Sequence, residues 1–347
     1  MNKKRKMLLW LSLPLAFLVI CIGTSIGSSN INIFNIISVI GNKLFSIPLI
    51  EGVGSNDVAI IWVVRFPRVL LAFMVGAALS VSGAVMQSIL KNPLASPYTL
   101  GVSSGASLGV GIYIVLGVSI PFIGNLALPF IGFLSGLLTV IMVILFANRV
   151  DRGMSNNTII LSGMVFSLFA SAMLTTISAL NTHKIEAITM WQMGSFNMRG
   201  WSYLLVGVPF FIVGVSIVLR YSREMDILTF GEDGAKAIGV ETEKVKKHLL
   251  FSTAVLTGSA VALSGTIGFI DLIVPHLVRK IFGPNHKVVI PMCILLGGSF
   301  MVLTDLVART IISPSELPVG AITAIIGAPF FGYLYFSKRS RWYYAKD

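Results

Sequence analysis

Charged residues are scarce in this chain of 347 residues, because Asp, Glu, Lys and Arg together make up only 12% of it. A soluble domain carries roughly 25%, so these residues cannot cover the water-facing surface of a soluble protein of this length. Hydrophobic residues make up 55% and the mean hydropathy is +0.88. Apolar runs of about 20 residues, the length of a helix that spans a bilayer, recur along the whole sequence. The composition therefore predicts an integral membrane protein rather than a soluble enzyme.

Cysteine and histidine are also scarce, and their spacing indicates no metal site. Cys21 and Cys293 both lie inside apolar runs, which argues against a disulfide, and the four histidines lack zinc-type spacing. The sequence contains no glycine-rich phosphate-binding loop ending in Gly-Lys-Ser/Thr and no recognisable nucleophile–base set. We therefore expect no catalytic residues, no metal site and no cofactor.

The net charge of +12 could suggest nucleic acid binding, but the basic residues lie between apolar runs, so we expect no nucleic acid partner. The runs predict ten spans, at roughly 7–27, 65–89, 99–117, 122–147, 156–180, 201–220, 246–265, 268–283, 287–311 and 319–336. If the N-terminus is cytoplasmic, 20 of the 26 Lys and Arg residues lie in inside segments. The other six are Lys43, Arg65, Arg68, Lys184, Arg199 and Arg309. This positive-inside bias predicts a multi-pass protein of the cell (inner) membrane with both termini in the cytoplasm.

The N-terminus resembles a secretory signal, because basic residues 3–6 precede an apolar run over 7–22. We interpret this run as the first membrane span, since it is long and further spans follow. A cleaved signal is the alternative.

Two short stretches suggest an internal repeat. Gly76–Gly83 and Gly258–Gly265 match at four of eight positions with a fixed offset, namely at both glycines, at Ala78/Ala260 and at Ser82/Ser264. The first stretch runs inward in the predicted topology and the second runs outward. The sequence therefore predicts an all-α transmembrane helical bundle with an inverted repeat, an architecture common in transporters.

The longest connection on the predicted cytoplasmic side, 220–248, contains many charged residues. Helix-forming residues between 226 and 238 end at Gly239, a plausible helix C-cap. Two short amphipathic helices on the membrane surface would explain this pattern, and a solvated loop is the alternative.

Five stretches form one pattern that covers roughly residues 58–336. They are Arg65–Leu70, Asn92–Ala106, Gly231–Val240, Gly268–His286 and Glu316–Phe331. Together they resemble the FecCD/BtuC-type family of iron-chelate and cobalamin permeases of ABC importers. Two positions depart from the family pattern: Ser96 stands where an acidic residue is common, and Asp271 stands where glycine is common. A carboxylate near the outer end of a span is costly unless paired or hydrated. We therefore expect Asp271 to pair locally with an arginine, with a role toward the substrate as the alternative.

The resemblance implies a single permease domain, 1–347, with ATPase-coupling helices in 226–240. It implies a second permease chain (an identical one or a close paralogue), two cytoplasmic ATPase subunits and an extracytoplasmic substrate-binding protein, all working in a lipid bilayer. ATP hydrolysis would then belong to the partners, so we do not expect this chain to be an enzyme.

The resemblance also suggests three sets of functional residues. The expected ATPase contact consists of Gly231, Glu232, Ala235, Ile238 and Gly239. The expected docking site for the binding protein consists of Arg65, Arg68 and Arg309. The alternative for these arginines is that they anchor span ends at the membrane surface, with Arg309 able to pair with Asp305 at i−4. We expect the second span and its neighbours to line the pathway with weakly polar residues such as Ser82, Met86, Gln87 and Ser88.

The expected function is uptake of an iron(III)-siderophore, with haem and cobalamin as alternative cargoes. An ion-coupled secondary transporter of a small metabolite is the competing class, since inverted repeats also occur there. Such carriers usually keep ionisable groups near the bilayer midplane. All the charged residues here fall in connections or at the ends of predicted spans, which favours an external energy source.

Overall fold

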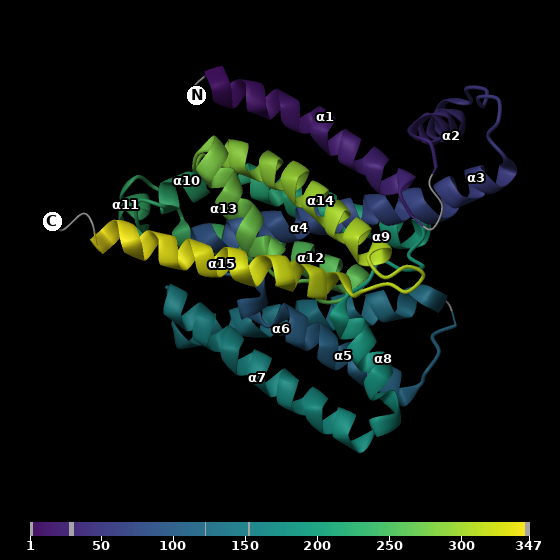
Figure 1. Ribbon diagram of the computed structural model, residues 1–347. Coiled ribbons are helices and arrows are strands. Elements are labelled where there is room, and N and C mark those ends of the chain that lie inside the picture. Colours follow the sequence, from purple (N-terminus) through teal and green to yellow (C-terminus); the bar gives the residue numbers. More distant parts are fainter. Residues whose placement is uncertain (1–2, 28–30, 122, 152, 344–347) are drawn as a thin grey trace.

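The computed structural model describes residues 3–27, 31–121, 123–151 and 153–343, and all regular structure in these ranges is helical. The helices at the ten expected spans form a bundle (Figure 1). They are α1 (Lys3–Ser25), α4 (Phe66–Ile89), α5 (Val102–Leu116), α6 (Ala127–Val150), α7 (Asn156–Leu180), α9 (Trp201–Arg220), α12 (Thr242–Ser264), α13 (Ile270–Phe282), α14 (His286–Thr310) and α15 (Val319–Tyr343). The shorter α-helices are α2 (Ile33–Phe45), α3 (Ser55–Ala59), α8 (Ile185–Met193), α10 (Ser222–Leu228) and α11 (Glu232–Ala237).

Within the described residues, six helices are long and apolar enough to cross a membrane. They are α1, α4 with the helical turns before it, α6, α7, α9 and α14. The other four expected spans also form helices, α5, α12, α13 and α15, but these are shorter or less apolar. The all-helical class is confirmed, and the count of ten spans stays a prediction.

The second expected span begins earlier than predicted. The helix is continuous from Ser55 to Ile89 and contains a wide π-helical segment, Ile60–Arg65, before α4. Pro67 lacks the N–H that a regular helix needs in its interior. In the π-helical segment the Phe66 N–H bonds to the Ile61 carbonyl, five residues back, and the helix passes the proline without a break.

Helix α4 is the centre of the bundle. Nearly all of its side chains are buried, and it packs against α1, α9, α12, α13 and α14. Glycines permit two of these contacts, because a Cβ at Gly76 would overlap the backbone of Gly297 on α14, and one at Gly83 would overlap the Asp271 carbonyl on α13. The neighbouring helices therefore touch the α4 backbone directly.

The glycines of the expected repeat have different environments. Gly76 and Gly83 contact backbone closely, and so does Gly265, whereas a Cβ at Gly258 would meet nothing closer than 3.6 Å. The matching glycines therefore pack differently in the two stretches. The inverted repeat stays a prediction.

The two ends of the bundle carry different short helices (Figure 1). Helix α1 begins and α15 ends at the same end, where α10 and α11 also lie; we call this the terminal end. Helices α2, α3 and α8 lie at the opposite end. The sequence did not predict α2 or α8, because both are short and lie outside the expected spans.

Candidate functional site

The connection at the terminal end folds into two short helices, and α10 begins at Ser222, before the expected coupling segment 226–240, whose role stays a prediction. Gly231 and Gly239 flank α11 with φ angles of 122° and 86°, backbone conformations that favour glycine. Two apolar side chains beside α11, Phe230 and Ile238, are 89% and 66% exposed. Large apolar side chains exposed at the end of a bundle are typical of a surface that another protein covers.

Two of the expected ATPase-contact residues face inward instead. Ala235 is fully buried, and Glu232 accepts a hydrogen bond of 2.6 Å from the Lys246 ammonium group. Lys246 is buried too, and it also donates to the Met154 carbonyl at 3.1 Å. These contacts fasten α11 to α12 and to the connection between α6 and α7. Ala235 and Glu232 therefore anchor the helix, while Phe230 and Ile238 form its exposed side.

A chain of polar contacts joins α10 to the centre of the bundle. The Asp226 carboxylate on α10 lies 2.5 Å from Nδ1 of His286, and Nε2 of His286 lies 2.5 Å from the Ser88 hydroxyl. A carboxylate accepts only, so Nδ1 carries the imidazole proton. Arg279 on α13 donates to Ser88 at 3.3 Å and also to the Gln87 side-chain oxygen. Helices α10, α14, α4 and α13 are thereby connected by buried and partly buried hydrogen bonds.

The four residues expected to line a pathway lie inside the chain. Ser82 and Met86 are fully buried, and Gln87 and Ser88 are 5% and 6% exposed. A side chain covered by its own subunit cannot face a path between two subunits in this conformation. Gln87 and Ser88 instead join α4 to α13 and α14, and a pathway role for the four stays a prediction.

A groove that the sequence interpretation missed lies between α5, α7 and α8, with a volume of about 360 Å³. Its lining is mostly hydroxylated, none of its lining residues is charged, and we call it the hydroxyl groove. Six of the hydroxyls come from Ser103, Ser104, Ser107, Ser171, Thr175 and Ser178. The last three recur every three or four residues within a helix that has no charged residue, so they share one face of α7. That spacing is the sequence signal that could have revealed the groove.

The three arginines expected at a docking site come together, but they are buried. Arg65, Arg68 and Arg309 are 5%, 7% and 9% exposed. Arg68 makes paired hydrogen bonds to Asp305 and to Glu316, with closest approaches of 2.8 Å to each carboxylate. Arg309 also lies 3.7 Å from Asp305, which confirms the expected pair at i−4. We call these five residues the arginine cluster.

The arginine cluster also joins α1 to α4 and α14. Arg65 donates to the Ser25 carbonyl at 2.9 Å, and Arg309 donates to the Gly23 carbonyl. Arginine anchors at the membrane surface would remain exposed, so burial shows a structural function for the cluster. A docking role for these arginines stays a prediction.

Asp271 does not occupy the expected position. It packs against Gly83, six residues before α4 ends, so it lies roughly 9 Å from the terminal end of α4 rather than at the opposite end. The reason is that α12 ends at Ser264 and an irregular segment precedes α13. The expected arginine partner is also wrong, because in the described chain the hydroxyl of Ser96 donates to Asp271 and no ion pair forms. Both positions that depart from the family pattern thus contact each other.

Comparison with known proteins gives consistent matches over nearly the whole chain. The profile of the FecCD transport family matches residues 15–337. A protein described as an uncharacterized ABC transporter permease of Bacillus subtilis strain 168 is 43% identical over 90% of this chain and 88% of its own length. The cobalamin import system permease of Halobacterium salinarum is 36% identical over 84% of this chain and 77% of its own length. The hemin transport system permease of Yersinia pestis is 34% identical over 81% of this chain and 84% of its own length.

A solved structure is similar as well. It is described as an inward-facing conformation of an ABC transporter of the metal-chelate type. It superposes with a TM-score of 0.81 at 32% sequence identity, covering 96% of this chain and 99% of that one.

Proposed function

The chain belongs to the FecCD transport family, and from that premise we propose that it is the permease subunit of an ABC importer for a metal chelate. It is a multi-pass membrane protein. The relatives are named for cobalamin, hemin and Fe(3+)-citrate import. We propose an iron(III)-siderophore as first cargo, with haem and cobalamin as alternatives.

The hydroxyl groove is the observation that best supports this function. A transported molecule must bind weakly enough to leave again, and uncharged hydroxyl groups offer weak, replaceable hydrogen bonds. The groove of about 360 Å³ is open along one side of a single chain. A second permease chain facing it would enclose a larger path, and we propose such a dimer of identical chains or close paralogues.

The terminal end is proposed to face the cytoplasm and two ATPase subunits. Phe230 and Ile238 give this end an exposed apolar contact beside α11. The Glu232–Lys246 pair holds α11 against α12, and the contacts of Asp226 extend from α10 to α4. Movement imposed on α10 and α11 by ATP binding would therefore reach the centre of the bundle through short hydrogen bonds. ATP hydrolysis would belong to the partner subunits.

The opposite end is proposed to receive the substrate-binding protein. The arginine cluster brings Arg65, Arg68 and Arg309 together at this end, and this concentration of positive charge favours an acidic partner. Glu316 is 27% exposed and gives a partner access to the rim of the cluster. Such charges steer association more than they add affinity.

Reconstitution tests this proposal. The chain is placed in liposomes with its ATPase and binding protein, and uptake of ferric siderophore, haem and cobalamin is measured separately. We expect uptake of one chelate that requires ATP inside and persists when ion gradients are collapsed. Uptake driven by a proton or sodium gradient without ATP would instead support the ion-coupled secondary transporter.

A further inference from the structure

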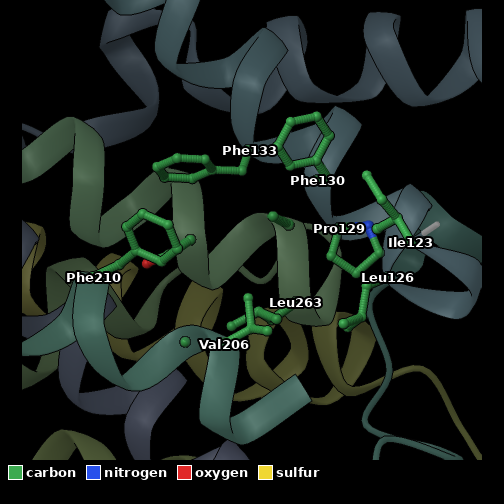
Figure 2. Close-up of a pocket in the computed structure, with 11 residues that line it drawn as sticks. Ile123, Leu126, Pro129, Phe130, Phe133, Val206, Phe210 and Leu263 are labelled. Carbon is green, nitrogen blue, oxygen red and sulfur yellow. The ribbon is translucent and has the colours of Figure 1, made fainter. Parts of the chain in front are cut away.

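A second groove lies between α6 and α9, with α12 as its floor (Figure 2). Its volume is about 240 Å³ and its exposed lining is entirely apolar; we call it the apolar groove. The lining includes Leu126, Phe130, Phe133, Val206, Phe210 and Leu263. Ser259 also contributes to the wall, but its hydroxyl donates to the Leu256 carbonyl.

The apolar groove is elongated. Phe133 and Phe210 lie at one end with ring centroids 4.5 Å apart, and Leu126 and Pro129 lie at the other end (Figure 2). Leu126 and Phe133 are seven residues apart, which corresponds to roughly 10 Å along a helix. The groove therefore follows α6 from the opposite end of the bundle toward its middle.

The helices that flank the apolar groove expose apolar side chains, as helices in contact with lipid do. On α6, Phe130 and Leu134 are 48% and 42% exposed, and on α9, Leu205 and Val206 are 63% and 40% exposed. No exposed polar residue interrupts α6 between 130 and 146. Helix α7, which lines the hydroxyl groove, does have exposed polar residues, such as Ser171 and Thr175. The apolar groove therefore faces the hydrocarbon of the membrane.

The size and chemistry of the apolar groove limit what can occupy it. Its volume lies below the roughly 300 Å³ at which sites for drug-sized ligands begin. A dry apolar cavity of about 150 Å³ already holds a molecule the size of benzene. A single alkyl chain fits these limits, and a metal chelate does not.

A cation lies near the apolar groove, because Arg199 contacts Tyr203, which precedes the lining residue Val206 by one helical turn. Tyr203, on the first turn of α9, donates to the Asn125 carbonyl at 2.8 Å and so bridges to the segment that precedes α6. The guanidinium carbon of Arg199 lies 4.6 Å from the centroid of the Tyr203 ring. Among the described residues, no carboxylate lies within the 4.0 Å that defines an ion pair with Arg199. An anionic group could therefore pair with it.

We propose that the apolar groove holds one acyl chain of an anionic phospholipid, whose headgroup pairs with Arg199. Lipid tails are as apolar as the groove, so apolar burial alone gives no preference for it over bulk lipid. Retention would come from the fit of the chain between the aromatic rings and from the charge of Arg199. The inference depends on membrane insertion and not on the cargo or the ATPase.

The test uses the full chain in nanodiscs containing phosphatidylglycerol with a photoreactive diazirine in one acyl chain. Cross-linked residues are mapped by mass spectrometry. A phosphatidylcholine probe with the same tails tests the headgroup. Val206→Trp fills the groove from its exposed edge, and Leu205→Trp, the adjacent exposed position outside the lining, is the matched control.

We expect wild-type cross-links to concentrate on Phe133 and Phe210, Val206→Trp to lose most of them, and Leu205→Trp to keep them. Arg199→Gln should lower labelling by phosphatidylglycerol roughly fivefold, the factor that about 1 kcal/mol per basic residue gives. Arg199→Lys should retain labelling by phosphatidylglycerol. Labelling by the phosphatidylcholine probe should be unchanged in both variants. Labelling spread evenly over α6, α7 and α9, or equal loss in both tryptophan variants, would overturn the proposal. So would cross-links between two copies of the chain through this groove.

Discussion

Asp305 is the residue on which the arginine cluster depends. Its side chain is 1% exposed and faces both Arg68 and Arg309. The pair with Arg309 is four residues away along one helix, so the sequence could predict it. The pair with Arg68 joins residues 237 positions apart, and only the packing of α4 against α14 creates it.

Removing Arg68 should destabilise the chain strongly. In Arg68→Ala, Asp305 would lose its paired hydrogen bonds while remaining buried, and breaking a buried ion pair costs about 3–5 kcal/mol. We expect a large fall in the apparent melting temperature in detergent, with Arg68→Lys intermediate because lysine cannot make the paired contacts. Arg149→Ala, an exposed position at the end of α6, is the control. Equal melting temperatures for Arg68→Ala and the control would show that the cluster is not structural.

The Glu232–Lys246 pair should respond asymmetrically to mutation. Lys246 is 1% exposed and Glu232 is 28% exposed, so water can replace the partner of the glutamate but not that of the lysine. Glu232→Gln should therefore cost about 3 kcal/mol, and Lys246→Met only about 1 kcal/mol. The stabilities of the wild type, both single variants and the double variant, measured by thermal melting, form a double-mutant cycle. A larger cost for Lys246→Met than for Glu232→Gln would refute this reasoning.

Helix α11 presents different side chains to the bundle and to the solvent, and they should give different defects. Ala235 is fully buried, so Ala235→Glu should displace α11, lower the stability of the chain and abolish transport. Ile238 is 66% exposed, so Ile238→Glu should leave the melting temperature unchanged and uncouple ATP hydrolysis from uptake. Uptake and ATPase rates are measured together in liposomes. Normal coupling in Ile238→Glu would place the ATPase contact elsewhere.

The connection between α6 and α7 is ordered by a carboxylate. The N–H groups of Ser155 and Gly153 donate to the Asp151 carboxylate, and these hydrogen bonds lower the pKa of this carboxyl from its ordinary value of 3.8. A lowered folded pKa means that the stabilisation is complete above the ordinary value and is lost as the pH falls through the folded pKa. Exchange of the Gly153 and Ser155 amides, corrected for intrinsic rates, should therefore stay protected between pH 8 and pH 5. Asp151→Asn should raise exchange at neutral pH, and the exposed control Asn157→Ala should not.

Sequence patterns predicted helices better than they predicted which side of a helix faces a pathway. Long apolar runs identified α6, α7, α9 and α14 closely, because any charged residues in these helices lie near the helix ends. Ser82 and Ser88 on α4 were assigned to a pathway because they are polar within a span. In the structure α4 is surrounded by other helices, while the similar hydroxyls of Ser171 and Thr175 on α7 line an open groove. Neighbouring helices decide this exposure, and a single sequence does not contain their arrangement.

Membrane orientation can be tested with two single-cysteine variants. Both native cysteines are buried, so their background labelling should be low. Asn197 is exposed at the opposite end, between α8 and α9, and Asp233 is exposed on α11 at the terminal end. An impermeant maleimide applied to intact cells should label Asn197→Cys and spare Asp233→Cys. Labelling of Asp233→Cys from outside would reverse the proposed topology.

Motifs identified the family more securely than they identified contacts within the molecule. The run from Asn92 to Ala106 is specific because several residue types must coincide, and the profile match over residues 15–337 agrees with it. The contact between Ser96 and Asp271 was not predicted, although both positions had been noted as departures from the family pattern. Two departures that contact each other are typical of a paired replacement. Recognising such a pair requires either coordinates or many related sequences.

The shortness of α13 has a consequence for how the protein enters the bilayer during synthesis. Thirteen residues of helix span only about 20 Å, less than the roughly 30 Å of the hydrocarbon core. The irregular backbone before α13 must satisfy its polar groups inside the protein, as the Ile267 carbonyl does by accepting from Tyr98 at 2.7 Å. Tyr98 belongs to a segment made much earlier in translation. We therefore expect that α13 does not enter lipid alone but inserts by folding against the part of the bundle that already contains α4 and α5.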